Sequence, residues 1–224
     1  MAGSNAVRTN WRRASLAAIK TLLFTGGEIH DWKGCGDEIE KILRADGSFD
    51  LTRVDEDLSI LESGLDPYDL IVFYYTIGEI TTAQKNGLLE WLAKGKGYAG
   101  VHSAADSFRE CPEYKAMVGG WFVTHPAYRE YQVSVTDPEH PITKGIEEFV
   151  VEDEQYITDY DPRVSVLASA LWKGEAMPVA WTKTWGQGRV FYLALGHDAK
   201  ACQHETFATL LQRGAAWAGT PQGE

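Results

Sequence analysis

Cysteine and basic residues are scarce in this chain. Its 224 residues include 3 cysteines, which form no Cys-x-x-Cys pair, so neither a disulfide framework nor a cysteine-type zinc site is indicated. The 21 lysines and arginines are outnumbered by 32 aspartates and glutamates, for a net charge of −11. An acidic chain without a basic stripe is a poor partner for nucleic acid or an anionic membrane, and we expect neither.

Long apolar runs are also lacking. No stretch approaches the roughly 20 apolar residues that are needed to span a bilayer. Arg12 and Arg13 precede a short apolar run like the start of an export signal, but Lys20 interrupts that run and no small-residue cleavage site follows it. We therefore expect a cytoplasmic protein, which an odd number of cysteines also fits.

Two common active-site motifs are absent. The glycine clusters at 26–27 and 95–97 have neither the dinucleotide spacing nor the P-loop spacing, so no nucleotide cofactor is expected. Gly100 to Ala104 has the shape of a nucleophile elbow, but its tip is His102 and the G-x-S-x-G spacing is missing. No cysteine stands at such an elbow. Covalent catalysis by serine or cysteine is therefore disfavoured.

Strand-like and helix-like segments alternate through the first half of the chain. Strands are expected at 19–24, 49–54, 68–75 and 98–101, and helices at about 37–46, from Thr81 to about 92, and from about 104 to 119. This alternation is typical of a mostly parallel sheet with crossover helices. Later segments predict strands at 128–136 and 164–170, a hairpin of 178–185 with 189–195, and a last helix at about 205–218.

The domain organisation follows from composition. Hydrophobic residues make up 44% of the chain, and no segment rich in proline and serine divides it. We expect a single domain at 18–219 with short tails at 1–17 and 220–224. Its fold class is α/β, with a mainly parallel central sheet between layers of helices and the 178–195 hairpin as an antiparallel extension at one edge.

Three histidines follow predicted strands. His30 comes after the first strand, His102 after the fourth, and His197 after the second strand of the hairpin. Because the carboxyl ends of parallel strands share one edge of a sheet, we expect these side chains at one rim, where they support little of the core. A single loop histidine is usually solvated or a cap, but converging imidazoles suit either a divalent metal or an acid/base pair.

Two further segments are expected to cover this rim. One is the aromatic loop around His125, and the other is the acidic run at 152–156, from which Glu154 is our choice as the carboxylate partner of the histidines. The alternative interpretation is that the acidic run is solvated surface. His140 and His204 are expected to be structural and exposed, respectively.

The order of motifs along the chain resembles the ThuA-like (trehalose-utilisation) family. The residues that carry the resemblance, from about 19 to 218, include His30-Asp31-Trp32, Gly100-Val101-His102-Ser103-Ala104, Thr124-His125-Pro126, Asp153-Glu154-Gln155-Tyr156 and Gly196-His197-Asp198. The resemblance implies a flavodoxin-like three-layer sandwich of the class I glutamine amidotransferase-like superfamily. His102 matches the position where amidotransferases carry the nucleophilic cysteine, so glutaminase activity is not implied.

The resemblance also implies a function. The family is associated with bacterial disaccharide use, beside sugar oxidoreductases that make 3-keto glycosides. We expect a carbohydrate-active enzyme that removes a proton next to the carbonyl of a keto-glycoside or keto-sugar, with elimination, isomerisation or hydrolysis following. The residues expected to act are His102 and Glu154 in acid/base catalysis, His30, His125 and His197 as ligands of zinc or another first-row divalent metal, and Tyr75, Asp106 and Tyr156 on substrate hydroxyls.

Two other classes of function stay open at this point. The protein could be a non-catalytic sugar-binding or regulatory module that kept the fold. It could instead be a subunit that works only with a sugar oxidoreductase partner, and a homo-oligomer is compatible with either.

Overall fold

The structure is a computed structural model that describes residues 17–221; of the predicted tails, residues 1–16 and 222–224 lie outside this range. The elements in chain order are β1 Ile19–Gly27, α1 Trp32–Asp46, β2 Phe49–Asp55, α2 Ile60–Ser63, β3 Leu70–Thr76, α3 Thr82–Ala93, β4 Gly97–Val101, a 3₁₀ turn His102–Asp106, α4 Pro112–Val118, β5 Gly120–Thr124, β6 Arg129–Val135, β7 Phe149–Asp153, β8 Ile157–Tyr160, β9 Ser165–Trp172, β10 Glu175–Trp185, β11 Gly188–Leu193, α5 Ala199–Cys202 and α6 Glu205–Gly219. None of the described helices is both long and apolar enough to cross a membrane.

The main sheet has nine strands in the order β2-β1-β3-β4-β11-β10-β9-β6-β7. The strands from β2 to β11 in this order are parallel, and those from β11 to β7 are antiparallel. The α/β sandwich is confirmed, with a larger antiparallel part than the predicted hairpin. β11 lies mid-sheet rather than at an edge, because Val190 to Leu193 are all fully buried, as a strand covered on both faces must be.

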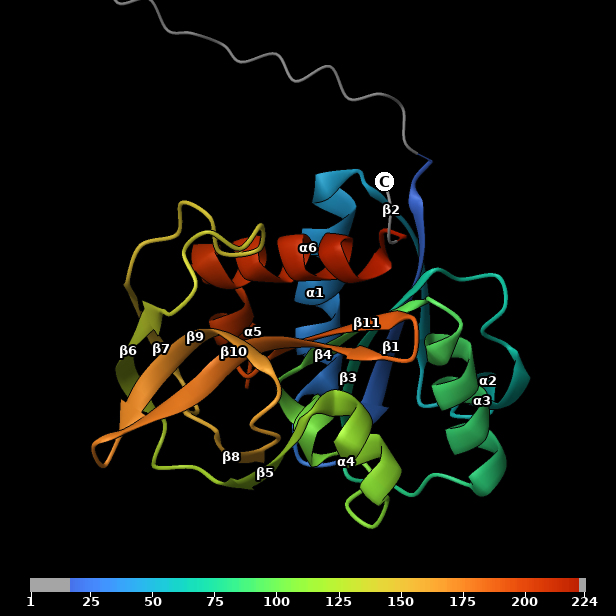
Figure 1. Ribbon diagram of the computed structural model, residues 1–224, viewed down its shortest axis with the longest axis horizontal. Helices are drawn as coiled ribbons and strands as arrows, with labels where there is room; N and C mark the ends of the chain where they lie inside the picture. Colours follow the sequence, from blue (N-terminus) through green and yellow to red (C-terminus); the bar gives the residue numbers. More distant parts are fainter. Residues whose placement is uncertain (1–16, 222–224) are drawn as a thin grey trace, which may run out of the picture.

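Helices cover both faces of the parallel part (Figure 1). Alternate residues of β3 face opposite sides, so that Leu70, Val72 and Tyr74 join the core under α1 and α6. Ile71, Phe73 and Tyr75 join the other core, under α3 and α4. This arrangement gives the three layers that the βα alternation predicts.

Side-chain caps set where two helices begin. The predicted capping box is present at α3, where the Thr81 hydroxyl accepts from the Gln84 N–H at 3.2 Å and the Gln84 side chain accepts from the Thr81 N–H at 2.9 Å. α1 begins five residues earlier than predicted, because the Asp31 carboxylate accepts from the Gly34 N–H at 3.0 Å.

The continuous helix predicted from about 104 to 119 is wrong. A 3₁₀ turn follows β4, and α4 starts only at Pro112. Phe108 has a φ of 51°, which breaks any helix, and Pro112 occupies the first turn of α4, where its missing N–H is tolerated.

Left-handed backbone gathers at the carboxyl ends of the parallel strands. Ile29, Glu56, Ile77 and His102 have φ values of 71°, 60°, 63° and 43°, and each lies within two residues of the end of β1, β2, β3 or β4. Gly196, after β11, has a φ of 105°. Such conformations cost free energy in residues other than glycine and concentrate at functional sites. The edge of the sheet where these residues gather is therefore a candidate functional site.

Candidate functional site

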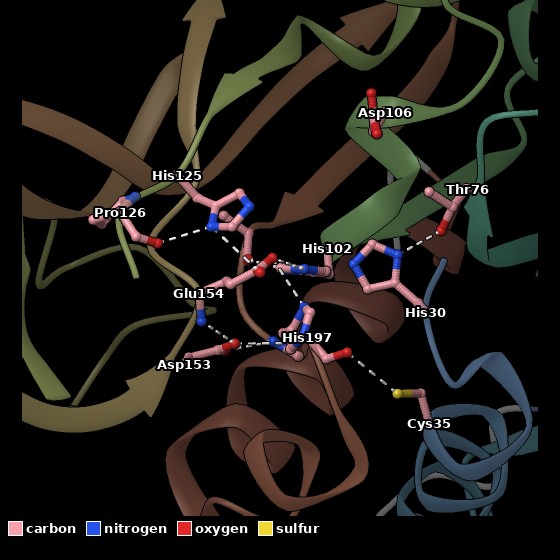
Figure 2. Close-up of polar contacts among 12 residues, drawn as sticks. His30, Cys35, Thr76, His102, Asp106, His125, Pro126, Asp153, Glu154 and His197 are labelled. Atoms are coloured by element: carbon pink, nitrogen blue, oxygen red, sulfur yellow. Dashed lines mark hydrogen bonds and ion pairs between the residues drawn. The ribbon is translucent and has the colours of Figure 1, made fainter. Parts of the chain in front are cut away.

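Three histidines and a glutamate meet beyond this edge of the sheet. His30 follows β1, His102 follows β4, His197 follows β11, and Glu154 follows β7. One ring nitrogen from each histidine and a carboxylate oxygen of Glu154 all lie within 4.8 Å of one another, so that this group could hold a metal ion. Figure 2 shows the His102 and His197 rings in contact with the Glu154 carboxylate and the His30 ring beside them. The structure thus brings together the side chains that follow the parallel strands.

His102 stands at the tip of the elbow and is fully buried, in contrast to the rim position expected from the sequence. Its Nδ1 lies 2.7 Å from the carbonyl oxygen of Ala194. Since a carbonyl only accepts, Nδ1 carries the hydrogen, and Nε2 keeps its lone pair in the neutral ring. That Nε2 lies 3.7 Å from Glu154 Oε2 and has no hydrogen-bond partner among residues 17–221.

His30 is held by the end of β3. Its Nδ1 lies 2.9 Å from the hydroxyl of Thr76, whereas its buried Nε2 has no hydrogen-bond partner in the described part of the chain. Burial, together with the neighbouring His102 and His197 rings, lowers the pKa of His30 to about 3. His30 is therefore neutral at physiological pH and presents a free ring nitrogen.

His197 contacts the carboxylate directly. Its Nδ1 lies 2.9 Å from Glu154 Oε2, without the alignment of a hydrogen bond. Burial opposes protonation, but the charges of Glu154, Asp153 and Asp198 together raise the pKa of His197 above its ordinary value. Burial likewise opposes ionisation of Glu154, yet His102 and His197 hold the pKa of that carboxyl far below its usual range. The site therefore contains a charged carboxylate beside a neutral His30 and a His197 that holds its proton more firmly than an ordinary histidine.

His125, a predicted metal ligand, lies outside the group of four. It belongs to the loop between β5 and β6, and 38% of its side chain is exposed. Its Nδ1 lies 2.8 Å from the Pro126 carbonyl oxygen and 3.3 Å from Glu154 Oε1 (Figure 2). Both neighbours are acceptors, so Nδ1 carries the hydrogen and Nε2 is free.

The three predicted substrate-binding residues have different surroundings. Tyr156 packs at a tilt against the His102 ring with centroids 4.0 Å apart and against Phe122 at 4.5 Å, so it forms an aromatic wall beside the histidines. Tyr75 instead packs in the core against Phe24, Phe73 and Phe108.

Asp106 lies apart from the histidines in Figure 2. Its carboxylate accepts two hydrogen bonds from Arg109, at 2.8 and 2.7 Å. Of the three predicted residues, Tyr156 is therefore the one whose ring packs against a histidine of the cluster.

Two residues that support the cluster, Thr76 at the end of β3 and Asp153 in the predicted acidic run, were given no role of their own from the sequence. Thr76 contacts His30. The fully buried Asp153 accepts hydrogen bonds from the backbone N–H groups of Glu154 and His197. A signal for Asp153 was present, because it follows Val151 by two residues in a strand and so shares the inward face. Nothing local to Thr76 indicated its contact with His30.

Comparison with known proteins decides the family. The family model described as ThuA, trehalose utilisation, matches residues 20–218. The chain belongs to the ThuA family. A ThuA-like protein from Parabacteroides merdae has 25% identity to this ThuA chain, with a TM-score of 0.81 over 93% of each chain. A second, from Bacteroides uniformis, has 22% identity and a TM-score of 0.76 over 92% of this chain and 94% of that one.

More distant matches share only the fold. A β-galactosidase from Bacillus circulans has 13% identity and a TM-score of 0.60, over 89% of this chain and 30% of that chain. No curated protein matches the chain. The resemblance expected from the motifs is therefore confirmed for the family and its class I glutamine amidotransferase-like fold.

Proposed function

We propose that this ThuA-family protein is an enzyme that acts on a carbohydrate at a divalent metal centre held by His30, His102, His197 and Glu154. The observation that carries the proposal is the convergence of three buried ring nitrogens, none with a hydrogen-bond partner among residues 17–221, on one carboxylate. Leaving buried polar atoms unpaired costs free energy, so such a group calls for a ligand. Imidazole nitrogen and carboxylate oxygen suit zinc and other first-row metals.

The outer hydrogen bonds of the histidines fit this role. Ala194 occupies Nδ1 of His102 and Thr76 contacts Nδ1 of His30, so in each ring Nε2 is the nitrogen left for a ligand. Outer contacts of this kind fix the tautomer and orientation of metal-binding histidines. The geometry favours a different division of roles from the sequence-based one, with His102 and Glu154 among the ligands and His125 outside them.

His125 is then the best group to carry a proton. Its Nδ1–H is oriented by Glu154 Oε1 and the Pro126 carbonyl, and its free Nε2 belongs to a side chain that solvent and substrate can reach. A carboxylate behind an imidazole supports the protonated ring and fixes its direction. Positioned bases of this type contribute about 10²–10⁴-fold to rate.

The proposed substrate is a keto-glycoside or keto-sugar. A keto group acidifies the neighbouring C–H bond, and a bound divalent cation would supply Lewis-acid polarisation of the carbonyl oxygen. His125 would remove the proton, and elimination, isomerisation or hydrolysis would follow. The Tyr156 and Phe122 rings offer an apolar wall to the C–H face of a sugar.

The test compares 3-keto-trehalose with unoxidised trehalose, using protein purified without a chelator and analysed for metal. We expect exchange of the α-proton in D₂O and turnover for the keto sugar alone. The His125→Asn variant retains a side-chain N–H near the place of Nδ1 but lacks the free nitrogen, so it should lose about 10²–10⁴-fold in turnover and still bind metal.

The His204→Asn variant is the matched control. His204 caps α6 by accepting from the Thr206 N–H, which asparagine also does, so activity should be unchanged. Binding of the keto sugar without exchange or turnover would contradict the enzyme and support a sugar-binding module. Activity only after addition of a sugar oxidoreductase would support a partner subunit.

The location and partners of the protein remain part of the proposal. We propose a cytoplasmic protein that uses no nucleotide cofactor. Two Salmonella typhimurium proteins of similar fold, at 17% and 14% identity, are named cytoplasmic proteins. Fractionation of the native cells tests the location, and light scattering tests whether the chain forms a homo-oligomer.

A further inference from the structure

We infer that Asp153 is the positioning residue of this site, and that its buried carboxylate holds His197 and Glu154 in the arrangement needed for metal binding. The inference rests on the proposed metal centre. Asp153 is fully buried, and it is not one of the four residues whose ligand atoms converge.

The hydrogen bonds of Asp153 join two distant segments. Its Oδ2 accepts from the Gly196 N–H at 2.7 Å, and its Oδ1 accepts from the His197 N–H at 3.1 Å and from the Glu154 N–H at 2.7 Å. Asp153 and Gly196 are 43 residues apart, and β6, β9 and β10 separate their strands in the sheet. One side chain therefore ties the end of β7 to the turn after β11, so that the two ligands it carries are placed together.

The turn that carries His197 is also held from its other side. The Tyr74 hydroxyl lies 3.0 Å from the Gly196 carbonyl oxygen and 3.2 Å from that of His197. Gly196 has a left-handed φ of 105°, and a Cβ there would lie 2.8 Å from the Phe207 ring. The carbonyl groups of the turn therefore accept from Tyr74, and its N–H groups donate to Asp153. Loss of Asp153 would leave three N–H groups, two of them in this turn, without this acceptor, and it would free the turn to rotate.

The surroundings of Asp153 also suit a bound cation. Asp153 accepts three hydrogen bonds from backbone N–H groups, so both of its carboxylate oxygens are occupied and neither is left to bind the metal itself. The Glu154 carboxylate and the three imidazole rings lie beside it, and this set of oxygen and nitrogen donors suits a divalent cation.

The Asp153→Asn variant tests the inference with zinc as the probe. An asparagine replaces one acceptor oxygen by an NH₂ donor, which must face a backbone N–H that also donates. We expect the Kd for Zn²⁺, measured by competition with a chromophoric chelator, to weaken by about 10–100-fold. Asp159→Asn, which removes an exposed acid on β8, is the matched control and should stay within about twofold of the wild type.

A merely structural role would lower the melting temperature and leave the Zn²⁺ affinity of the folded variant unchanged. That result would overturn the inference. If Asp153→Asn does not fold, amide hydrogen exchange of the wild-type protein without metal decides instead. The Gly196 and His197 amides should be as protected as those of β11, and exchange as fast as at the exposed turn residue Gly174 would overturn the inference.

A wrong metal centre and a wrong role for Asp153 would give different results in these experiments. If the wild-type protein binds neither Zn²⁺ nor Mn²⁺, the metal centre is wrong, whereas the amide exchange still reports whether Asp153 holds the turn. If the Gly196 and His197 amides of the wild-type protein are protected but Asp153→Asn binds zinc as tightly as the wild type, only the positioning role is contradicted.

Discussion

Each of the three histidines in this site has one ring nitrogen without a hydrogen-bond partner among residues 17–221. The elbow gives His102 a left-handed backbone, and the Ala194 carbonyl then binds Nδ1, so that Nε2 alone faces Glu154. The Thr76 hydroxyl, which can donate or accept, contacts Nδ1 of His30, and its Nε2 has no partner in the described part of the chain. Substitutions can therefore be designed to remove one nitrogen and retain the hydrogen bond of the other.

The His102→Asn variant is the sharpest case. Asparagine tolerates a left-handed backbone, and its amide nitrogen lies near the place of Nδ1, so the bond to Ala194 is retained and Nε2 is lost. We expect Zn²⁺ affinity to fall by more than the ~10–100-fold that outer contacts contribute. The melting temperature should change little.

The His102→Ala variant should differ from His102→Asn in stability. This variant leaves the buried Ala194 carbonyl unpaired, at a cost of about 1–3 kcal/mol. At about 2–4 °C per kcal/mol for a chain of this size, its melting temperature should fall by several degrees. Zinc affinity that is retained in His102→Asn would exclude His102 as a ligand.

At the scale of the elements, helix caps and strand ends position the site. α1 starts directly after His30 because Asp31 caps it, and α5 starts directly after His197 because the Asp198 carboxylate accepts from the Ala201 N–H at 2.7 Å. Each cap ends the loop that carries a histidine. α3 has a cap of two reciprocal hydrogen bonds but contributes no side chain to the cluster, so a change in this cap should affect stability alone.

Removal of the α3 cap should destabilise the protein without affecting the site. Thr81→Ala removes the hydroxyl that accepts from the Gln84 N–H, and the free energy of unfolding should fall by about 0.5–2 kcal/mol. Thr82→Ala, one residue on and without a capping bond, should change it by less than about 0.5 kcal/mol. Urea denaturation measures both; equal effects would show that the capping box contributes nothing.

At the scale of the whole molecule, the site joins the two parts of the sheet. The parallel strands carry His30, His102 and His197, whereas Glu154 comes from the antiparallel part and His125 from the loop before it. A ligand that contacts all of these side chains links segments that are far apart in sequence. Binding should therefore stabilise the entire fold rather than one loop.

Zinc at about 100 times its Kd should raise the free energy of unfolding by about 2.7 kcal/mol. The melting temperature should then rise by roughly 5–11 °C, and a chelator should reverse the rise. His102→Asn should show little of it. An unchanged melting temperature for the wild type with saturating Zn²⁺ and Mn²⁺ would contradict the metal centre.

The same shift should depend on pH. The raised pKa of His197 means that the metal-free protein holds a proton there at pH values where an ordinary histidine has lost it. Zinc must displace that proton, so the stabilisation by zinc should grow as pH rises from about 6 to 8.

The sequence by itself determined the local features of this protein. Alternating βα segments indicated the parallel sheet, Thr81 and Gln84 indicated a capped helix, and the positions of His30, His102 and His197 after strands indicated a shared edge. Each of these depends on neighbours within a few residues, or on the rule that parallel strands end together. Such patterns can be read without knowledge of long-range contacts.

Only the tertiary structure decided which atoms of these residues are available. That Tyr75 lies in the aromatic core, that Asp106 pairs with Arg109, and that β11 lies mid-sheet follow from the packing of whole layers. The tie between Asp153 and the turn at Gly196 spans 43 residues. No local pattern encodes such a contact, because it exists only once the strand order has brought both segments to one place.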